Sequence, residues 1–340
     1  MRVDGGIGLD LASAPGDACD AEAAGYDGVW VAETSHDPFF PLLLAAEHTE
    51  RIELGTAIAV AFARSPMTTA YAAWDLQAYA RGRLNLGLGS QIKPHIERRF
   101  SMPWSHPAAR MREYIQALRA IWDSWQHGTR LDFRGDFYQH TLMTPFFDPG
   151  PHDFGPPAVF VAAVGEQMTR SAAEVADGLL VHGFTTERYL REVTMPMVTA
   201  GLASSGRTRG DFQLSYPAFV VTGATEEDVA RAAVAVRRQI AFYGSTPAYR
   251  GVLELHGWGD LQPELNRLSK QGGWEQMGEL IDDDMLAAFA VAGEPASIAG
   301  QLEARFGALV DRISFYTPFS ADPVLFQDIL AGLRSGPGAA

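Results

Sequence analysis

The chain has very little cysteine: Cys19 is the only one among 340 residues. A single cysteine excludes a disulfide within the chain and fits a reducing, cytoplasmic setting. Positive charge is also scarce, with 27 Lys and Arg against 41 Asp and Glu and a net charge of −14. We therefore expect no general attraction to nucleic acid or to an anionic membrane. The sequence has no apolar run of about 18 residues and no apolar core of a secretory signal near Met1, so we expect no membrane span and a cytoplasmic protein.

Several catalytic signatures are missing too. No Gly-x-Ser-x-Gly elbow is present, and Cys19 lies in a predicted helix far from any strand end, so we expect no hydrolase nucleophile. The dinucleotide fingerprint of open α/β sheets fails after Gly87-Leu88-Gly89, because Ile92 stands where its third glycine would be. The acidic and imidazole groups between Glu33 and Asp37 match no metal-ligand spacing, and we predict no metal site.

What the sequence does contain is a repeated alternation of apolar strands and helices. Its clearest unit is a strand from Ile52 to Ala61, a helix that begins after Ser65-Pro66, and a second strand from Leu84 to Gly89. Strands that are apolar on both faces belong to parallel sheets covered by helices. The other predicted strands are 3–9, 29–32, 158–162, 178–182, 212–221 and 310–316. The predicted helices are 15–25, 39–50, 107–125, 166–176, 185–204, one from Thr225, 295–306 and 322–333. Eight strands alternating with helices predict one (β/α)8 TIM barrel domain over residues 1–340.

Two segments interrupt this alternation. Residues 128–157 contain a predicted hairpin over 131–138 followed by a loop rich in Pro and Gly, and residues 243–284 are rich in Gly, Trp and Leu. Insertions of this length commonly lie over the C-terminal face of a barrel, so we expect both to line a substrate pocket. Substrate contact or ordinary surface packing would each explain His140, Tyr249, His256 and Trp258.

The residues that follow the strands are the candidates for a ligand site, because barrels of this kind bind ligands at the C-terminal ends of their strands. Val164-Gly165 and Gly183-Phe184-Thr185 each lead straight into a helix, whose free N–H groups and dipole suit a phosphate. We expect Thr185 to cap the second of these helices. Capping without a ligand would explain either exit as well. The remaining cofactor-binding candidates at strand exits are Ser90, Gln91, Lys93, Ala163 and His182.

A basic segment follows the fourth predicted strand. It contains Lys93, His95, Arg98 and Arg99. Such a patch at a pocket mouth would hold an acidic ligand, although a solvated helix face neutralised by Glu97 has the same composition. An apolar mouth with phosphate-binding ends and few acid–base groups suits a bound redox cofactor that carries the reaction itself.

Four segments match a known family: GYDGVW at 25–30, IELGTAI at 52–58, GLGSQ at 87–91 and EVADG at 174–178. With them the chain resembles the bacterial-luciferase-like oxidoreductases, and more closely their deazaflavin-dependent branch, which uses coenzyme F420. The resemblance implies a homodimeric barrel with an isoalloxazine-type ring at its mouth, beside a non-proline cis peptide at Ala57-Ile58. It also implies phosphate contacts at Val164, Gly165, His182 and Gly183, and an acidic site residue at Glu33.

The chain departs from one part of this branch. Its sugar-phosphate dehydrogenases carry a His directly after the acid that maps onto Glu33 and a Glu shortly after the fourth strand, where this chain has Thr34 and Ile92. We therefore do not expect a sugar-phosphate substrate. The predicted catalytic residues are Glu33, with His36 or His95 for proton transfer, and a structural hydrogen bond is the alternative role of either His.

The sequence thus predicts an F420-dependent oxidoreductase that transfers hydride between the deazaflavin and a small, uncharged organic substrate. An FMN-dependent monooxygenase served by a separate reductase is one alternative. A non-catalytic flavin-binding protein is the other.

Overall fold

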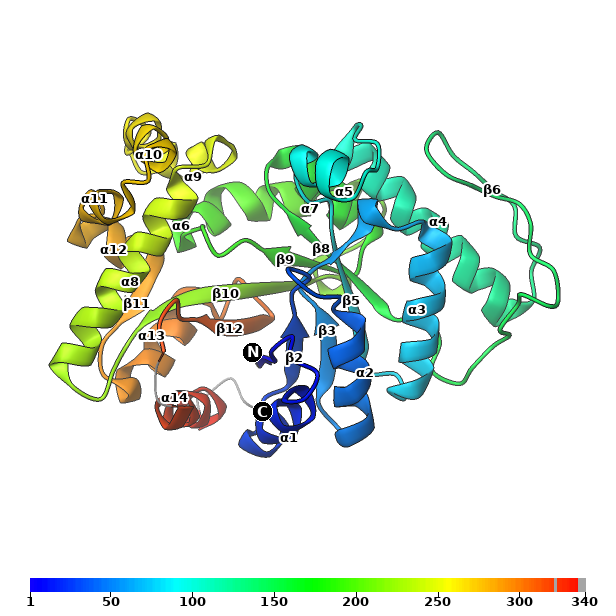
Figure 1. Ribbon diagram of the computed structural model, residues 1–340, viewed down its shortest axis with the longest axis horizontal. Coiled ribbons are helices and arrows are strands. Elements are labelled where there is room, and N and C mark those ends of the chain that lie inside the picture. The colour runs from blue at the N-terminus through cyan, green and yellow to red at the C-terminus, as the bar shows by residue number, and fades with distance from the viewer. Residues whose placement is uncertain (321–322, 336–340) are drawn as a thin grey trace. The chain divides into compact units, whose positions relative to one another are not determined.

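The computed structural model describes residues 1–320 and 323–335, and its elements are labelled in Figure 1. Eight strands form a closed parallel barrel, which confirms the predicted (β/α)8 fold. In barrel order they are β1 (Arg2–Gly6), β2 (Gly28–Val31), β3 (Glu53–Thr56), β5 (Leu84–Gly89), β8 (Ala158–Ala163), β9 (Gly178–Val181), β10 (Gln213–Val221) and β12 (Arg312–Tyr316). All residues of β5 and β9 are buried, as expected for strands covered on both faces.

The helices follow local sequence signals. Ser65 accepts a hydrogen bond from the Thr68 N–H at the start of its helix, and Thr225 forms a capping box with Asp228. The helix predicted over residues 107–125 forms, and it carries a stripe of apolar residues from Met111 to Trp125 that is buried along its whole length. The helices are α1 (Ala14–Ala24), α2 (Phe39–His48), α3 (Pro66–Tyr79), α4 (Pro107–His127), α5 (Glu166–Val175), α6 (Glu187–Tyr189), α7 (Met195–Ser204), α8 (Glu226–Gly244), α9 (Arg250–Leu255), α10 (Leu261–Lys270), α11 (Trp274–Glu279), α12 (Asp283–Phe289), α13 (Pro295–Phe306) and α14 (Pro323–Ser335). The predicted start of the last helix, Asp322, lies outside the described residues.

The third strand is shorter than predicted. The expected run from Ile52 to Ala61 is divided into β3 and a two-residue strand β4 (Ala59–Val60), and β4 pairs with β5. The peptide bond between Ala57 and Ile58, at the break, is cis, as the family resemblance implied.

The helix after β9 begins later than predicted. Thr186, rather than Thr185, is its N-cap: the Thr186 hydroxyl oxygen accepts a hydrogen bond from the Tyr189 N–H at 3.1 Å. The Thr185 N–H donates to the Gly183 carbonyl at 3.0 Å, so Gly183 to Thr185 form a tight turn before the helix. The expectation that Thr185 caps this helix was therefore wrong by one residue.

The chain divides into two compact units, each described below by itself. The N-terminal unit comprises Asp4–Leu180 and Val198–Gln213. The C-terminal unit comprises Met1–Val3, Val181–Met197 and Leu214–Ala340. The expectation of a single domain stays a prediction.

The first insertion begins with the expected hairpin. Strand β6 (Phe133–Arg134) pairs antiparallel with β7 (Gln139–His140), so the connecting turn spans residues 135–138. The buried Glu113 carboxylate of α4 accepts hydrogen bonds from three successive backbone N–H groups of that turn, at 2.6 to 2.9 Å. A carboxylate on another element thus satisfies N–H groups that the short hairpin leaves unpaired.

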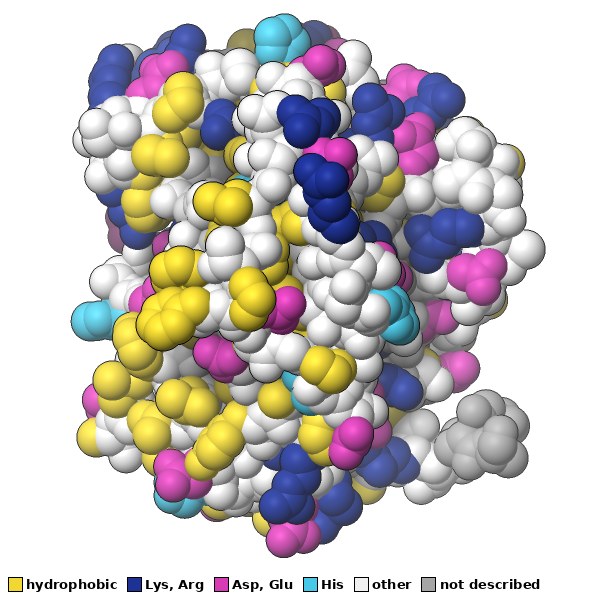
Figure 2. All heavy atoms as spheres, turned by 90° about the vertical axis from the view of Figure 1, so that its right-hand side faces the viewer, with side chains coloured by type: hydrophobic (Ala, Val, Ile, Leu, Met, Phe, Trp, Pro, Cys, Tyr) yellow, Lys and Arg dark blue, Asp and Glu magenta, His cyan; other side chains and the backbone are white. Residues whose placement is uncertain are grey.

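The rest of this insertion packs against outer helices of the barrel. The Tyr71 hydroxyl of α3 donates to the Phe147 carbonyl at 2.6 Å, and the Trp74 indole donates to the Gly150 carbonyl at 3.2 Å. These contacts do not support the expectation that this part of the insertion lines a substrate pocket. Some of its apolar side chains are exposed, Leu142 to 76% and Phe146 to 90%. Figure 2 views this side of the molecule and shows hydrophobic side chains gathered at the surface.

The second insertion is helical. Helices α9 to α12 gather around α8 (Figure 1), and their apolar faces form one buried cluster that includes Phe184, Ile240, Leu265 and Phe289. A further short strand that the sequence did not predict, β11 (Ala290–Ala292), pairs in parallel with β10 outside the barrel ring. No helix within the described residues is long and apolar enough to cross a membrane.

Candidate active site

The exit of β2 in the N-terminal unit carries a buried ion pair. One Glu33 carboxylate oxygen accepts the Val60 N–H at 2.7 Å and the Arg64 guanidinium at 2.6 Å, and Arg64 also binds Asp37 at 2.7 Å. We call Glu33, Arg64 and Asp37 the Glu33 clamp. The Glu33 and Arg64 side chains are only 6% and 17% exposed. Burial opposes the charge of Arg64, but its bonds to the two carboxylates raise its pKa above the ordinary value.

The clamp holds the backbone that follows β3. The Glu33 N–H donates to the Ile58 carbonyl at 3.1 Å, while the Glu33 side chain binds the Val60 N–H. The Ala57 N–H donates to the Val31 carbonyl at 2.7 Å, which joins the same segment to β2. These contacts favour a positioning role for Glu33. Its predicted catalytic role stays a prediction.

The two predicted proton-transfer residues lie on exposed segments. The His36 side chain is exposed in the loop between β2 and α2 and forms no hydrogen bond with the described residues. His95 begins a single π-helical turn, η2 (His95–Arg99), and its Nδ1 lies 3.5 Å from the Arg99 guanidinium. Arg99 donates to the Thr34 carbonyl at 2.6 Å and so joins this turn to the β2 exit.

The rest of the basic segment lies in solvent. Lys93 and Glu97 are both exposed and approach to 3.8 Å, which agrees with the solvated-face interpretation for Lys93. Binding of an acidic ligand by this segment stays a prediction.

The strand exits of the N-terminal unit expose small and apolar side chains. Ala32 and Ala57 are exposed one residue beyond the paired Val31 and Thr56. The register between β5 and β8 places the half-buried Ser90 opposite Ala163 just past the last paired residues. The next residues on the β5 exit are Gln91, half-buried, and Ile92, 57% exposed, while on the β8 exit Val164 is 42% exposed.

The N-terminus of α5 is open. Gly165 is its N-cap, with φ of 79° and no side-chain cap, and it is exposed. No heavy atom lies within 4 Å of the place where a Cβ of residue 165 would stand. The start of α5 therefore has no side-chain cap and has open space beside its N-cap residue, which leaves room for an anion at the helix start.

The exit of β9 in the C-terminal unit is arranged differently. The His182 Nδ1 accepts the Phe184 N–H at 3.0 Å, and the His182 Nε2 lies 3.1 Å from the Tyr249 hydroxyl. Burial lowers the pKa of His182 to about 4. Since the N–H groups of Phe184 and Thr185 already have acceptors, an anion could use them only by replacing those bonds. Phosphate binding by these residues and by Gly183 stays a prediction.

Most side chains at the β9 exit pack in the core or form hydrogen bonds within the protein. Phe184 is 2% exposed within the apolar cluster, so only its backbone can reach a ligand. The Thr185 hydroxyl is buried with no hydrogen-bond partner among the described residues, whereas Thr186 binds the His256 Nε2 at 2.8 Å.

The sequence placed Arg64 and Tyr316 at strand exits without a specific role, and it did not single out Tyr243. An arginine at one strand exit and acids at the neighbouring exit were a usable signal for the Glu33 clamp. Tyr243 lies in an insertion without a readable pattern. No comparable signal was available for it.

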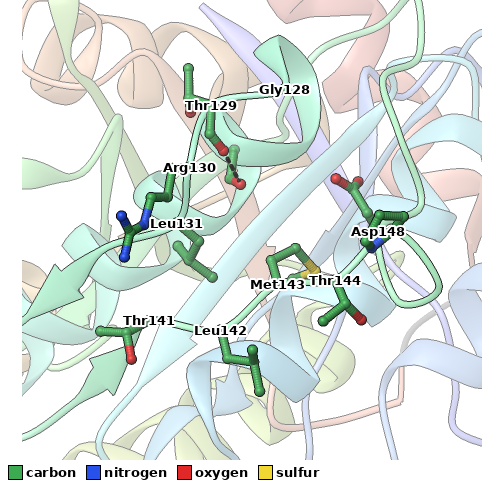
Figure 3. Close-up of a pocket in the computed structure, with 11 residues that line it drawn as sticks. Gly128, Thr129, Arg130, Leu131, Thr141, Leu142, Met143, Thr144 and Asp148 are labelled. Carbon is green, nitrogen blue, oxygen red and sulfur yellow. Dashed lines mark hydrogen bonds between the residues drawn. The ribbon is translucent and has the colours of Figure 1, made fainter.

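A cavity of about 570 Å3 opens at the C-terminal end of α4, beside the first insertion (Figure 3). The Ser124 hydroxyl donates to the Thr129 carbonyl at 2.7 Å across one wall. None of its lining residues directly follows a barrel strand, so this cavity is not part of the strand-exit site. Its lining residues are Ser124, Gly128, Thr129, Arg130, Leu131, Thr141, Leu142, Met143, Thr144, Pro145 and Asp148.

Comparison with known proteins places these features in a family. The model of the luciferase-like monooxygenase family matches residues 6–312. An uncharacterised protein of Mycobacterium tuberculosis is 60% identical over 313 residues, which cover 92% of each chain. The 5,10-methylenetetrahydromethanopterin reductase of Archaeoglobus fulgidus is 27% identical, over 89% of this chain and 88% of that protein. The solved structure of the coenzyme F420 dependent tetrahydromethanopterin reductase from Methanopyrus kandleri superposes with a TM-score of 0.78 at 21% identity, and covers 98% of both chains.

Proposed function

Because this chain belongs to the luciferase-like monooxygenase family, we propose that it is an oxidoreductase that uses coenzyme F420. In this proposal it transfers hydride between the deazaflavin and a small, uncharged organic substrate. The F420-dependent reductase among its structural neighbours supports the choice of cofactor.

The single observation that carries the proposal is the character of the strand exits in the N-terminal unit. Ala32, Ala57 and Val164 expose apolar surface there, and the start of α5 beside Val164 lacks a side-chain cap. Apolar surface suits the face of a flat tricyclic ring, and uncapped N–H groups suit a phosphodiester. The donor set therefore fits F420, with Gly165 and the first turn of α5 holding its phosphate.

A bound deazaflavin would supply the hydride chemistry, and the protein would supply orientation and protection from water. The Glu33 clamp would keep the segment from Ala57 to Val60 in place against the ring. Ile92 and Val164 would exclude water with their apolar side chains. His36, in contact with solvent, would exchange the substrate's proton with water.

Titration of the purified protein tests the proposal. We expect the protein to quench F420 fluorescence, and we expect the quenching to saturate as the protein concentration rises. A change of Val164 to Asp should weaken that binding at least tenfold, because it places a negative charge beside the phosphate site. The control is Val234→Asp on α8, a position of similar exposure at 48%. Tight binding of FMN together with an unchanged F420 spectrum would contradict the proposal.

The second candidate is an FMN-dependent monooxygenase that receives reduced flavin from a separate reductase. The family to which the chain belongs is named for monooxygenases, which supports this second candidate. Oxygen consumption with chemically reduced FMN separates the two, because rapid consumption coupled to substrate oxidation would require the flavin mechanism.

We also propose a cytoplasmic homodimer. Light scattering on the purified protein would give twice the chain mass of 36.9 kDa if the subunits pair. A mass equal to one chain at micromolar concentration would contradict it.

A further inference from the structure

Four aromatic side chains pack together in the C-terminal unit. His182 stacks on Tyr249 with ring centroids 4.5 Å apart, and the Tyr243 ring meets His182 edge-on at 4.7 Å. A Cβ at Gly183 would lie 3.1 Å from the Tyr316 ring. We call His182, Tyr243, Tyr249 and Tyr316 the tyrosine cluster.

The hydrogen bonds of His182 fix where its proton lies. A backbone N–H can only donate, so the His182 Nδ1 that receives the Phe184 N–H must be unprotonated. A neutral imidazole then carries its proton on Nε2, and that proton is donated to the Tyr249 hydroxyl oxygen at 3.1 Å. Burial favours this neutral form by lowering the pKa of His182.

This arrangement leaves the hydroxyl proton of Tyr249 without an acceptor. Its oxygen is the acceptor of the bond from His182, and no second partner of the hydroxyl exists among the described residues. Burial raises the pKa of Tyr249, so the group keeps its proton. A donor whose oxygen already accepts a hydrogen bond is also a stronger donor, because such bonds polarise one another.

A second donor lies beside it. The hydroxyl oxygens of Tyr243 and Tyr316 are 2.6 Å apart, so one of them donates to the other. The accepting hydroxyl keeps its own proton, again with no further partner among the described residues. The pair therefore offers one proton and Tyr249 offers another.

The cluster is placed where ligands reach this fold. His182 directly follows β9 and Tyr316 is the last residue of β12, so both stand at strand exits. Tyr249 ends the short 3-10 turn η5 (Pro247–Tyr249) of the second insertion. All four side chains of the cluster are half-buried, so the rings are fixed while part of each reaches the surface.

We propose that the tyrosine cluster binds an acceptor oxygen of a ligand, with Tyr249 and the Tyr243–Tyr316 pair as its donors and His182 as the residue that orients Tyr249. The ligand group is a carbonyl or phosphoryl oxygen, from either the organic substrate or the cofactor. The inference rests on the proposed function only in taking the strand exits as the binding end.

Nitrogen-15 NMR of histidine-labelled protein tests the inference without activity. The free protein should show His182 neutral, with an unprotonated Nδ1. The protein is then titrated separately with F420, with inorganic phosphate and with cyclohexanone as a neutral ketone. We expect one of these three ligands to shift the His182 Nε2 signal. That ligand identifies the source of the oxygen.

Two variants make the test specific. Tyr249→Phe removes the donor and keeps the ring, so we expect at least a fivefold weaker dissociation constant for the ligand that shifts His182. Tyr189→Phe is the matched control, since Tyr189 packs against the same apolar cluster and its hydroxyl forms no hydrogen bond with the described residues. Its affinity should equal that of the wild type.

The outcomes separate this inference from the proposed function. If F420 does not bind but phosphate or cyclohexanone shifts His182, the cofactor proposal fails and the donor site stands. The donor site is overturned if three results occur together: F420 binds, none of the three ligands shifts the His182 signal, and Tyr249→Phe binds F420 as tightly as the wild type does. A His182 protonated on Nδ1 in the free protein would also overturn it.

Discussion

Replacing Glu33 should reveal whether this acid holds the site or performs chemistry. Glu33→Ala would leave the Val60 N–H without an acceptor, which costs about 1–3 kcal/mol for a buried donor. It would also leave Arg64 with Asp37 as its remaining carboxylate partner. Breaking a buried ion pair by removing one partner costs about 3–5 kcal/mol. Because Asp37 still compensates part of the Arg64 charge, we expect a total loss of about 3–4 kcal/mol of unfolding free energy.

Urea denaturation of Glu33→Gln, Arg64→Ala and the double variant measures the pair directly. The amide oxygen of Gln can keep one of the two donors, so we expect a smaller loss, about 2 kcal/mol, and a coupling energy with Arg64 of about 1.5–3 kcal/mol. The exposed pair of Arg231 and Glu227 is the control, with an expected coupling of less than about 0.5 kcal/mol. F420 affinity should fall along with stability, because the clamp holds the segment after β3.

A different pattern would refute this reasoning. If Glu33→Gln unfolds at the wild-type urea concentration, binds F420 normally and loses turnover a hundredfold, Glu33 is a catalytic acid or base. The clamp would then be incidental to function.

Three further predictions follow from other parts of the molecule. Gly87→Ala should destabilise the chain by more than about 3 kcal/mol in urea, because its Cβ would lie 1.8 Å from a backbone oxygen of β3, whereas Gly300→Ala in α13, with open space around it, should stabilise by about 0.5–1 kcal/mol. Burial lowers the pKa of His182 from about 6.5 to about 4, so its contribution to stability, on the order of 3 kcal/mol, is complete above pH 6.5 and is lost as pH falls toward 4. Urea titrations at pH 8, 6 and 4.5 should show a part of this loss that His182→Gln abolishes, and equal losses in both proteins would contradict the assignment. His36→Ala should lower turnover roughly tenfold to a hundredfold, with His95→Ala as the comparison; an unchanged turnover in His36→Ala would exclude it from proton transfer.

Local periodicity explains why the sequence predicted the barrel so well. The stripe from Met111 to Trp125 and the apolar strands repeat at the spacing of their own secondary structure, and tertiary contacts only reinforce them. Thr185 and Thr186 show the limit of such signals. Both are good caps, and the hydrogen bond from the Thr185 N–H to Gly183 decides between them. The sequence could not rank the two.

The site was harder to predict because its key contacts join residues far apart in the chain. Glu33 was recognised as the acid at the β2 exit, but its binding to Arg64 depends on how the β3 exit turns. Tyr249 comes from an insertion whose pattern gave no indication of structure, and its role depends on the tautomer of His182. Residue spacing predicts neither which distant residues pair nor which nitrogen of a histidine carries the proton.

These two arrangements divide the roles at the strand exits in a way that the family resemblance alone does not. In the N-terminal unit the acid after β2 is neutralised by Arg64, and Thr34 stands where a related branch has an imidazole. The buried acid there is therefore held in an ion pair, and among the described residues the imidazoles at these exits, those of His36 and His95, are exposed. In the C-terminal unit His182 is buried and neutral, so it can fix a hydroxyl but is a weak base near pH 7. The first set suits the proposed hydride transfer, with its proton exchanged with water, and the second set, taken by itself, suits the proposed binding of a ligand oxygen by hydroxyl donors.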